Sequence, residues 1–303
     1  MSTDGLRLNG ILPPLTTPFN ELGDVDFEGL VGNVRLYNET GLAGYVALGS
    51  NGEVVHLTSD ERVRIIETIK NAAASGMTIV AGINEHSSHA AIEAARRAAR
   101  AGADAALVIT PYFYKSSMTQ SVLARHFEKV ADHSPIPVLI YNVPQNTGVV
   151  IESQTIASLA AHPNIVGVKD SAGNFAAIAE TIRRSPEGFA VLTGNGGILY
   201  PSLMMGARGA VLAVACAAPR ACSELYEAVE AGDYGKAREL QNRIAPLSHI
   251  VTAGLGVAGL KAAMEMAGYT GGVTRSPLAS VSETEREKIR AVMRETGLFP
   301  GLE

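Results

Sequence analysis

The sequence predicts an α/β chain folded as a (β/α)8 barrel with a C-terminal helical extension. Eight short apolar runs alternate with longer amphipathic runs between Gly10 and Ala215, and no further short run of this kind follows. Most of the short runs are almost continuous in Val, Ile, Leu and Ala, a pattern typical of parallel strands that are buried on both faces. Eight strand–helix units favour a closed barrel, although an open doubly wound sheet has the same alternation.

The helices expected between the strands carry their charges on one face, and two of them have recognisable start and stop signals. Thr58 and Glu61 form a capping box before one helix, and Ser87 caps another that stops at Gly102. In chain order we expect strands at residues 10–16, 44–49, 78–83, 105–110, 137–142, 165–170, 189–194 and 209–215, with helices at 59–74, 87–101, 119–132, 152–161 and 174–184.

The chain after the eighth expected strand is helical. Its last helix begins with the capping pair Ser282 and Glu285. We expect residues 1–217 to form the catalytic barrel and residues 218–303 to hold the last barrel helix and an appended helical region. The expected helices here are 220–231, 234–244, 257–266 and 282–295.

The composition is that of a globular chain with a large core. Of its 303 residues, 47% are hydrophobic and 18% are charged, which excludes a disordered chain. The net charge is −5 and no basic block stands out, so we expect neither nucleic acid nor a membrane surface as a partner. The first nine residues lack signal-peptide features, no apolar stretch reaches the ~20 residues of a membrane span, and Cys216 and Cys222 match no zinc or redox motif. We therefore expect a cytoplasmic protein.

Lys169 is unusual because it lies at the end of an otherwise apolar strand. The other lysines lie in loops or helical segments, where solvated faces are available. Burial disfavours the charged form of a lysine and lowers its pKa, and a neutral amine is a nucleophile towards carbonyl carbon. Barrels of this kind carry their active sites at the C-terminal ends of the strands, so the position predicts a catalytic amine. The alternative is a structural lysine paired with Asp170 or another carboxylate.

Tyr141 lies near the end of the preceding strand. Neighbouring strands are ~4.8 Å apart, so we expect Tyr141 and Lys169 to face one pocket. A phenol at this place can carry a proton to or from a reacting oxygen. The alternative is a packed aromatic ring whose hydroxyl binds the backbone.

A Gly-rich turn at residues 49–53 (GSNGE) follows the second strand. Two glycines flank two small polar residues, and such a turn can direct backbone N–H groups, a hydroxyl and an amide at an anion such as a substrate carboxylate. An ordinary strand-to-helix turn has the same composition. Thr16 and Thr17 follow the first strand, where they either orient the same site or simply pack at the strand end.

Other signals predict neither a cofactor nor a metal. Gly254, Gly256 and Gly259 have dinucleotide-fingerprint spacing but no strand precedes them. His86 and His89 lack an evident third metal ligand. Residues 194–197 (GNGG) follow the seventh strand, where barrels often bind phosphate, but we interpret them as a turn that lines the pocket.

Three motifs, in this order and at this spacing, resemble the dihydrodipicolinate synthase / N-acetylneuraminate lyase family. They are residues 49–53 (GSNGE), residues 141–144 (YNVP) with the Thr-Gly pair at 147–148, and residues 167–171 (GVKDS). The resemblance extends from Gly10 to about Leu298. It implies a (β/α)8 barrel, class I aldolase chemistry without metal or organic cofactor, and usually a homotetramer built as a dimer of dimers.

The resemblance also implies roles for individual residues. Lys169 forms a Schiff base with pyruvate or another 2-oxo acid, Tyr141 shuttles protons, and Ser50 relays them. A protonated imine withdraws electrons, so the adjacent carbon–carbon bond forms or breaks through an enamine. With the residues named above, the expected substrate-binding set is Asn51, Gly49, Thr16, Thr17, Asn146, Gly194 and Val211.

Within the family the chain most resembles 4-hydroxy-2-oxoglutarate aldolase, which yields pyruvate and glyoxylate. Ser50 and Asn51 stand where dihydrodipicolinate synthase usually has paired threonines, and Asn146 stands where it typically has an arginine for the aldehyde's carboxylate. A neutral amide lacks the charged bidentate fork of arginine. We therefore expect cleavage of hydroxyoxoglutarate. The alternatives are the synthase itself, which condenses pyruvate with aspartate semialdehyde to 4-hydroxy-tetrahydrodipicolinate, and a sugar-acid aldolase or dehydratase.

Phe113 departs from the family pattern. Members commonly place here a tyrosine that reaches into a neighbouring subunit's site, whereas this chain has Phe113 between Tyr112 and Tyr114. The missing hydroxyl keeps open a further hypothesis, a relative that binds a small 2-oxo acid without catalysis. Ser59 and Arg62 replace histidines of some lysine-regulated synthases, so the sequence gives no match to a feedback site.

Overall fold

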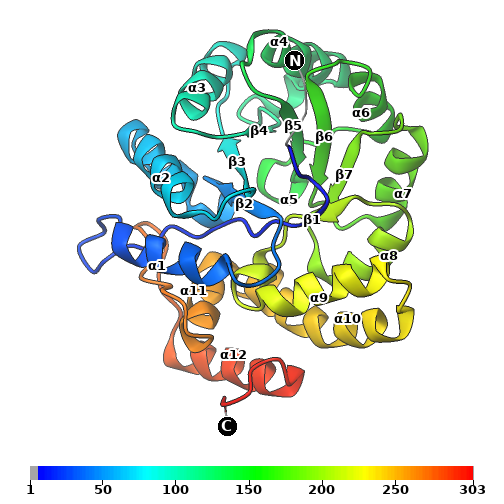
Figure 1. Ribbon diagram of the computed structural model, residues 1–303. Helices are drawn as coiled ribbons and strands as arrows, with labels where there is room; N and C mark the ends of the chain where they lie inside the picture. The colour runs from blue at the N-terminus through cyan, green and yellow to red at the C-terminus, as the bar shows by residue number, and fades with distance from the viewer. Residues whose placement is uncertain (1–5, 303) are drawn as a thin grey trace.

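The computed structural model, which describes residues 6–302, is a (β/α)8 or TIM barrel with a C-terminal helical part, as predicted (Figure 1). Eight parallel strands are hydrogen-bonded in the order β1-β8-β7-β6-β5-β4-β3-β2. They are β1 (Gly10–Ile11), β2 (Gly44–Ala47), β3 (Thr78–Ile83), β4 (Ala105–Ile109), β5 (Val138–Asn142), β6 (Ile165–Asp170), β7 (Ala190–Thr193) and β8 (Gly209–Ala210).

The barrel closes between β1 and β2 through an irregular junction. Pro13 and Pro14 have no N–H group to donate, so regular pairing stops after the two residues of β1. The Leu15 N–H then donates to the Val46 carbonyl at 2.9 Å, and the Val46 N–H donates to the Pro13 carbonyl at 3.0 Å. The strand expected at 10–16 is therefore shorter in the structure.

Side chains of the strands form two apolar layers, one inside the barrel and one between the sheet and the helices. Successive side chains of a strand point to opposite faces. In β5, Leu139 and Tyr141 accordingly belong to the inner layer, whereas Val138 and Ile140 belong to the outer one. The inner layer includes Leu12, Val46, Val80, Leu107, Ile109, Leu139, Tyr141, Leu192 and Val211.

The barrel helices begin at the expected capping signals. Thr58 and Glu61 form the capping box of α2 (Ser59–Ala72), and Ser87 Oγ accepts from the Ala90 N–H at the start of α3 (Ser88–Arg100). The helices α4 (Gln120–His133), α6 (Ser153–Leu159) and α7 (Phe175–Arg184) lie close to their expected ranges.

Three helices were not predicted. The first, α1 (Phe27–Tyr37), contains Gly29 and Gly32, which weaken a helical pattern. The other two are short: α5 (Pro144–Thr147) is a single turn, and α8 (Leu199–Met204) is six residues long and contains Pro201. Segments of this length carry too little periodicity for sequence reasoning to detect.

The C-terminal helices gather on one side of the barrel (Figure 1). They are α9 (Pro219–Glu230), α10 (Tyr234–His249), α11 (Gly256–Met266) and α12 (Glu283–Thr296). α10 packs on α9 and α12, and α11 packs on α12 and on the 3₁₀ segment η5 (Ala213–Cys216) that replaces the end of the strand expected at 209–215. The chain thus passes from barrel to extension without a linker, and the division at residue 217 stays a prediction.

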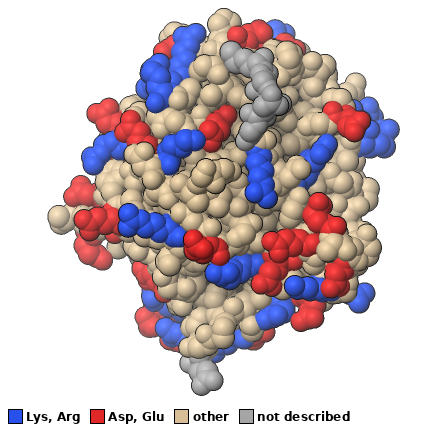
Figure 2. All heavy atoms as spheres, in the orientation of Figure 1, with Lys and Arg blue, Asp and Glu red and all other residues tan. Residues whose placement is uncertain are grey.

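The surface carries charges of both signs. On the face drawn in Figure 2, Lys and Arg side chains are interspersed with Asp and Glu rather than gathered in one patch. Across residues 6–302, no helix combines the length and apolarity that crossing a bilayer requires.

A close approach of β3 to the chain after β2 gives a stability prediction. A Cβ added at Gly82 would lie 2.1 Å from the Leu48 carbonyl oxygen. We expect Gly82→Ala to lower the free energy of unfolding by about 1–3 kcal/mol because the two backbone segments must separate.

Gly32→Ala is the matched control, since a Cβ at Gly32 of α1 meets nothing within 4 Å. Alanine there should raise the free energy of unfolding by about 0.5–1 kcal/mol. Urea denaturation followed by circular dichroism measures both variants, and equal values for the two would contradict the close approach.

Candidate active site

Lys169 and Tyr141 lie side by side in the interior of the barrel. They are register partners in the parallel pair of β5 and β6, so their side chains point to the same face of the sheet. Both are buried, with 4% and 6% of their surfaces exposed. Lys169 Nζ lies 4.2 Å from the centroid of the Tyr141 ring. The structure thus brings together the two groups that the sequence singled out.

Asp170, the carboxylate considered as a structural partner of Lys169, is bound to other groups. Asn142 Nδ2 donates to Asp170 Oδ2 at 2.7 Å, and the Ala172 N–H donates to Oδ1 at 2.9 Å. Strand alternation directs Asp170 to the opposite face from Lys169. Among the ion pairs of residues 6–302, none includes Lys169. Its amine is therefore not committed to a carboxylate.

The Tyr141 hydroxyl has polar neighbours on several sides. Ser50 Oγ lies 3.3 Å from it, at hydrogen-bond distance. Burial by itself raises the pKa of Tyr141, but the charge of Lys169 and hydrogen bonds with Ser50, Lys169 and Ser171 lower this pKa overall. A phenol whose pKa is lowered gives up its proton more readily. The arrangement therefore suits proton transfer beside an amine.

The turn after β2 has a strained backbone. Its centre is a 3₁₀ turn (Ser50–Gly52), whose first amide groups have no partner inside the turn. Leu48 and Glu53, on either side, have φ angles of 57° and 53°, in the left-handed region that non-glycine residues rarely adopt. Such strain persists only where the surroundings enforce it, and it is concentrated at functional sites. The turn directs the Ser50 hydroxyl towards Tyr141.

The two threonines after β1 lie beneath this turn. Thr17 Oγ1 donates to the Gly52 carbonyl at 2.8 Å, and Thr16 Oγ1 lies 3.3 Å from the Met264 sulfur of α11. Both threonines are 2% exposed. Their hydroxyls are thus engaged with the protein, and their predicted contact with substrate stays a prediction.

The remaining predicted substrate-binding residues lie at the C-terminal ends of the barrel strands or in the inner layer of the barrel. Gly194, which follows β7, has no room for a side chain, because a Cβ there would lie 1.9 Å from Ser171 Oγ. Val211 belongs to the inner layer. Asn51 is partly exposed in the turn that also contains Gly49, and Asn146 is exposed on α5. Substrate binding by these residues stays a prediction.

An exposed aromatic pair follows β4. Phe113 and Tyr114 are 72% and 71% exposed, and their ring centroids lie 5.1 Å apart. Tyr112 is partly buried with its ring edge-on to His86 at 4.4 Å. Exposed apolar rings that lie next to one another are typical of surfaces that contact another molecule.

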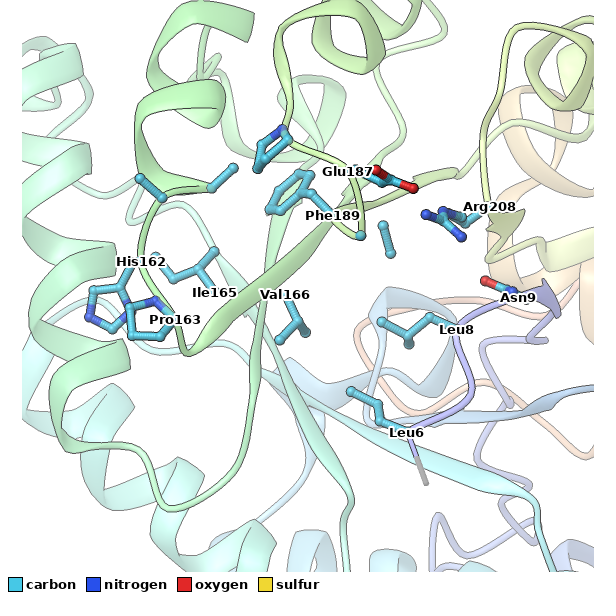
Figure 3. A pocket seen from close by; sticks show the side chains of 15 residues that line it. Leu6, Leu8, Asn9, His162, Pro163, Ile165, Val166, Glu187, Phe189 and Arg208 are labelled. Carbon is cyan, nitrogen blue, oxygen red and sulfur yellow. The ribbon is translucent and has the colours of Figure 1, made fainter. Parts of the chain in front are cut away.

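A cavity of about 310 Å³ lies where β6, β7 and β8 begin, at the end of the barrel opposite to Lys169 and Tyr141. Figure 3 shows its apolar wall, which includes Leu8 and Phe189, with Glu187 and Arg208 at the rim. Barrel enzymes carry their catalytic groups at the C-terminal ends of the strands. The pair of Lys169 and Tyr141 therefore defines the candidate site, and this cavity does not.

The described residues contain no evident place for a metal ion. Within residues 6–302, no three His, Cys, Asp or Glu side chains are grouped to hold one. Gly254 and Gly256 lie in a π-helical turn (Ile250–Gly254) and at the start of α11, and no strand precedes them. Cys216 and Cys222 are unpaired and buried, and burial raises the pKa of both thiols, that of Cys222 to about 12.

Sequence reasoning missed two polar side chains at the site. Ser171 lies two residues after Lys169, a spacing that places both on one face of a strand and that was available as a signal. Lys261 is 2% exposed in α11, so the expectation that every other lysine has a solvated face was wrong. The apolar stretch at 262–264, which follows it directly, was the available signal.

Comparison with known proteins shows which family the chain belongs to. The model of the dihydrodipicolinate synthetase family matches residues 7–296. The chain belongs to this family. Family members are carbon–carbon lyases of the class I aldolase type, and the chain is accordingly an enzyme of this class.

Relatives cover the chain almost completely. The 4-hydroxy-tetrahydrodipicolinate synthases of Methanothrix thermoacetophila and Rhizobium meliloti are each 37% identical to it, over 96% of this chain and 98% and 99% of theirs. A dihydrodipicolinate synthase structure from Thermotoga maritima has a TM-score of 0.92 at 28% identity and covers 96% of this chain and 99% of its own. A pyruvate complex of the Acinetobacter baumannii synthase has a TM-score of 0.89 at 33% identity, with the same two coverages.

The electrostatics of the pair predict how Tyr141 titrates. In Lys169→Met the lysine charge is gone and burial dominates, so the pKa of Tyr141 should rise well above its value in the unchanged protein. Ultraviolet difference spectra of tyrosinate, with Tyr141→Phe to assign the signal, measure this shift. Lys70→Met, which removes a lysine that pairs with Asp104, is the control. Identical titrations of Tyr141 in the Lys169 and Lys70 variants would show that the lysine charge does not act on the phenol.

Proposed function

We propose that the chain is a pyruvate-type aldolase whose Schiff base forms on Lys169. The observation that carries this proposal is the buried pair itself. Lys169 has an amine that joins no ion pair among residues 6–302, and this amine lies 4.2 Å from the ring of a tyrosine whose pKa is lowered. The matched family and the pyruvate complex of a relative support it. The substrate class proposed is a small 2-oxo acid.

The first half of the reaction builds the imine. Lys169 Nζ attacks the ketone carbon of the 2-oxo acid, and the resulting carbinolamine loses water to give a protonated imine. Tyr141, with Ser50 beside it, delivers the proton with which the oxygen leaves as water. The turn at residues 49–53 receives the carboxylate through its amide groups and the Ser50 hydroxyl. Because these hydrogen-bond donors are already fixed in place, they need not reorient when charge develops on the substrate.

The second half uses the imine as an electron sink. Tyr141, left as a phenolate after giving its proton to the departing oxygen, takes a proton from the methyl carbon and so gives an enamine. In the condensation direction the enamine attacks an aldehyde carbon, which restores the imine, and the aldehyde oxygen takes the proton back from Tyr141. In the cleavage direction the hydroxyl of the substrate loses its proton, the carbon–carbon bond breaks, and the electron pair moves into the enamine. After cleavage, Tyr141 returns the proton it took from the hydroxyl to the enamine carbon, which restores the imine. In both directions water then hydrolyses the imine and frees Lys169.

The aldehyde partner has two candidates. The first is aspartate semialdehyde, which makes the enzyme a 4-hydroxy-tetrahydrodipicolinate synthase. This candidate is supported by the names of relatives that are 32–37% identical over nearly the whole chain. Of the two, it has the greater support from the comparisons.

The second candidate is glyoxylate, released by cleavage of 4-hydroxy-2-oxoglutarate. The observation that favours it is Asn146, an exposed amide on α5 just beyond the end of β5. Glyoxylate and aspartate semialdehyde each carry one carboxylate, but that of the semialdehyde lies three bonds from the aldehyde carbon. The amide of residue 146 provides no charged fork for a carboxylate at that distance. A sugar-acid substrate fits the same neutral side chain.

For the whole molecule we propose a cytoplasmic homotetramer. The exposed pair Phe113 and Tyr114 supports an interface at this face, and the two unpaired cysteines support a reducing compartment. One similar structure is described as a monomeric synthase variant, so assembly differs among relatives. Sedimentation at equilibrium distinguishes one 31.7-kDa chain from four.

Borohydride trapping tests the proposed chemistry. With pyruvate present, reduction should fix a stable adduct on the peptide that contains Lys169, because an imine is reduced to a secondary amine. Lys169→Ala should abolish the adduct, and Lys70→Met should leave it unchanged. Mass spectrometry of the digested protein locates the adduct. Its absence with every 2-oxo acid tried would refute the aldolase proposal.

Two assays run side by side identify the acceptor. One measures condensation of pyruvate with aspartate semialdehyde, and the other measures cleavage of 4-hydroxy-2-oxoglutarate. If Asn146 faces the acceptor, Asn146→Arg should raise kcat/KM for aspartate semialdehyde by about tenfold, since arginine supplies a charged bidentate donor. Trapping of pyruvate on Lys169 should persist.

His133→Arg is the control for added charge, because His133 ends α4, at the other end of the barrel. An equal response to arginine at positions 133 and 146 would exclude a direct contact of residue 146 with the acceptor. Turnover in only one of the two assays by the unchanged protein assigns the reaction.

A further inference from the structure

A buried cluster of charges lies directly behind the turn after β2. Lys261 Nζ of α11 lies 2.7 Å from Glu53 Oε1, and the two side chains are 2% and 1% exposed. The other carboxylate oxygen, Glu53 Oε2, accepts a hydrogen bond from the backbone N–H of Arg275 at 2.9 Å. His56 Nδ1 lies 3.4 Å from the same oxygen. Removing two charges from water is costly unless their geometry is good, and one partner left alone is strongly destabilising.

Lys261 is also anchored on its own side. Its Nζ donates to the Val273 carbonyl at 2.6 Å and lies 4.6 Å from the centroid of the Phe19 ring. Burial lowers the pKa of Lys261, and the charge of Glu53 opposes this shift. The amine is therefore held from three directions, and its position is transmitted to Glu53.

Glu53 is the residue at which the strained turn ends. Its φ of 53° is unusual for a residue with a side chain, and glycine is the usual choice for such a conformation. Nothing in the turn's own hydrogen bonds selects a charged residue at this position. The ion pair supplies the reason, because a carboxylate here fastens the turn to a helix from the far end of the chain.

We propose that Lys261 is a positioning residue for the reaction, which through its buried ion pair with Glu53 holds the turn at residues 49–53 in the form that receives the substrate carboxylate. This inference rests on the proposed function for its substrate, a 2-oxo acid. It assigns a role in the active site to the C-terminal helical region, which contributes no residue to the pair of Lys169 and Tyr141.

Kinetics of Lys261→Met separate positioning from mere stability. Loss of the tether should raise KM for pyruvate by about tenfold. The fall in kcat should be smaller, because Lys169 and Tyr141 are untouched and of the proton-transfer groups only Ser50 lies in the turn. A variant that is only less stable loses active molecules, which lowers the apparent kcat and leaves KM unchanged. Lys70→Met removes a lysine that pairs with Asp104 elsewhere and should change neither constant.

Hydrogen exchange provides a readout that does not need turnover. Amides of residues 49–53 should exchange faster in Lys261→Met than in the unchanged protein, whereas those of β5 and β6 should not change. If the unchanged protein fails to trap pyruvate, the proposed aldolase function is refuted. Hydrogen exchange still tests whether Lys261 holds residues 49–53 in place. Equal exchange of the turn in variant and unchanged protein would overturn the inference.

A double variant keeps the test valid if Lys261→Met folds poorly. Glu53→Gln combined with Lys261→Met removes both charges, so no unpaired carboxylate is left buried and stability should recover. The turn nevertheless lacks its tether, so the raised KM and the faster exchange should remain. Recovery of KM together with stability would show that the ion pair serves folding alone, and the inference would be wrong.

Discussion

The register of β5 against β6 is the constraint on which the chemistry depends. Pairing Tyr141 with Lys169 across two parallel strands makes both point inward at the same level, and burial then excludes most water from them. A shift by one residue would send one of the two side chains to the outer layer, where Val168 and Ile140 now lie. The lowered pKa of Tyr141 follows from the same placement, because the lysine charge acts over a short distance in a poorly screened interior. Backbone hydrogen bonds, rather than any contact between the side chains, therefore set the geometry of the pair.

The turn after β2 obeys a different constraint, because it is held by side chains from distant parts of the chain. Gly82 lets β3 approach the Leu48 carbonyl, Thr17 binds the Gly52 carbonyl, and Glu53 is fastened to α11 by Lys261. Each contact comes from a different element, and together they keep two positive-φ residues in place on either side of the turn. A site built in this way combines a rigid strand pair with a turn whose precision depends on the whole fold, including the C-terminal helices.

These two constraints explain what sequence reasoning predicted. Continuous apolar runs gave β3 to β7 nearly residue for residue, and Lys169 and Tyr141 stood out because a polar group at the end of such a run is visible without a structure. The ends of β1 and β8 were too long because Pro13 and Pro14 and a 3₁₀ segment interrupt runs that remain apolar. The burial of Lys261 was not predicted, because the helical pattern of α11 does not show which of its faces the turn after β2 will cover. The apolar residues 262–264 indicate that this part of the helix is buried, but they do not show that Lys261 meets Glu53, because that contact is tertiary.

Buried and exposed residues of the site differ in how much family membership says about the substrate. Identity of 32–37% with named synthases extends over 96% of the chain and shows the family, and with it the barrel that the strands form. In the proposed reaction the acceptor aldehyde comes from outside the barrel. Asn146 and Phe113 are exposed, so packing in the core does not fix them. Substitution at such positions costs the fold little, so acceptor preference can change while the Schiff-base chemistry is retained. The buried pair is thus separated in space from the exposed residues proposed to meet the acceptor, and this separation lets one family keep its reaction class while its members differ in acceptor.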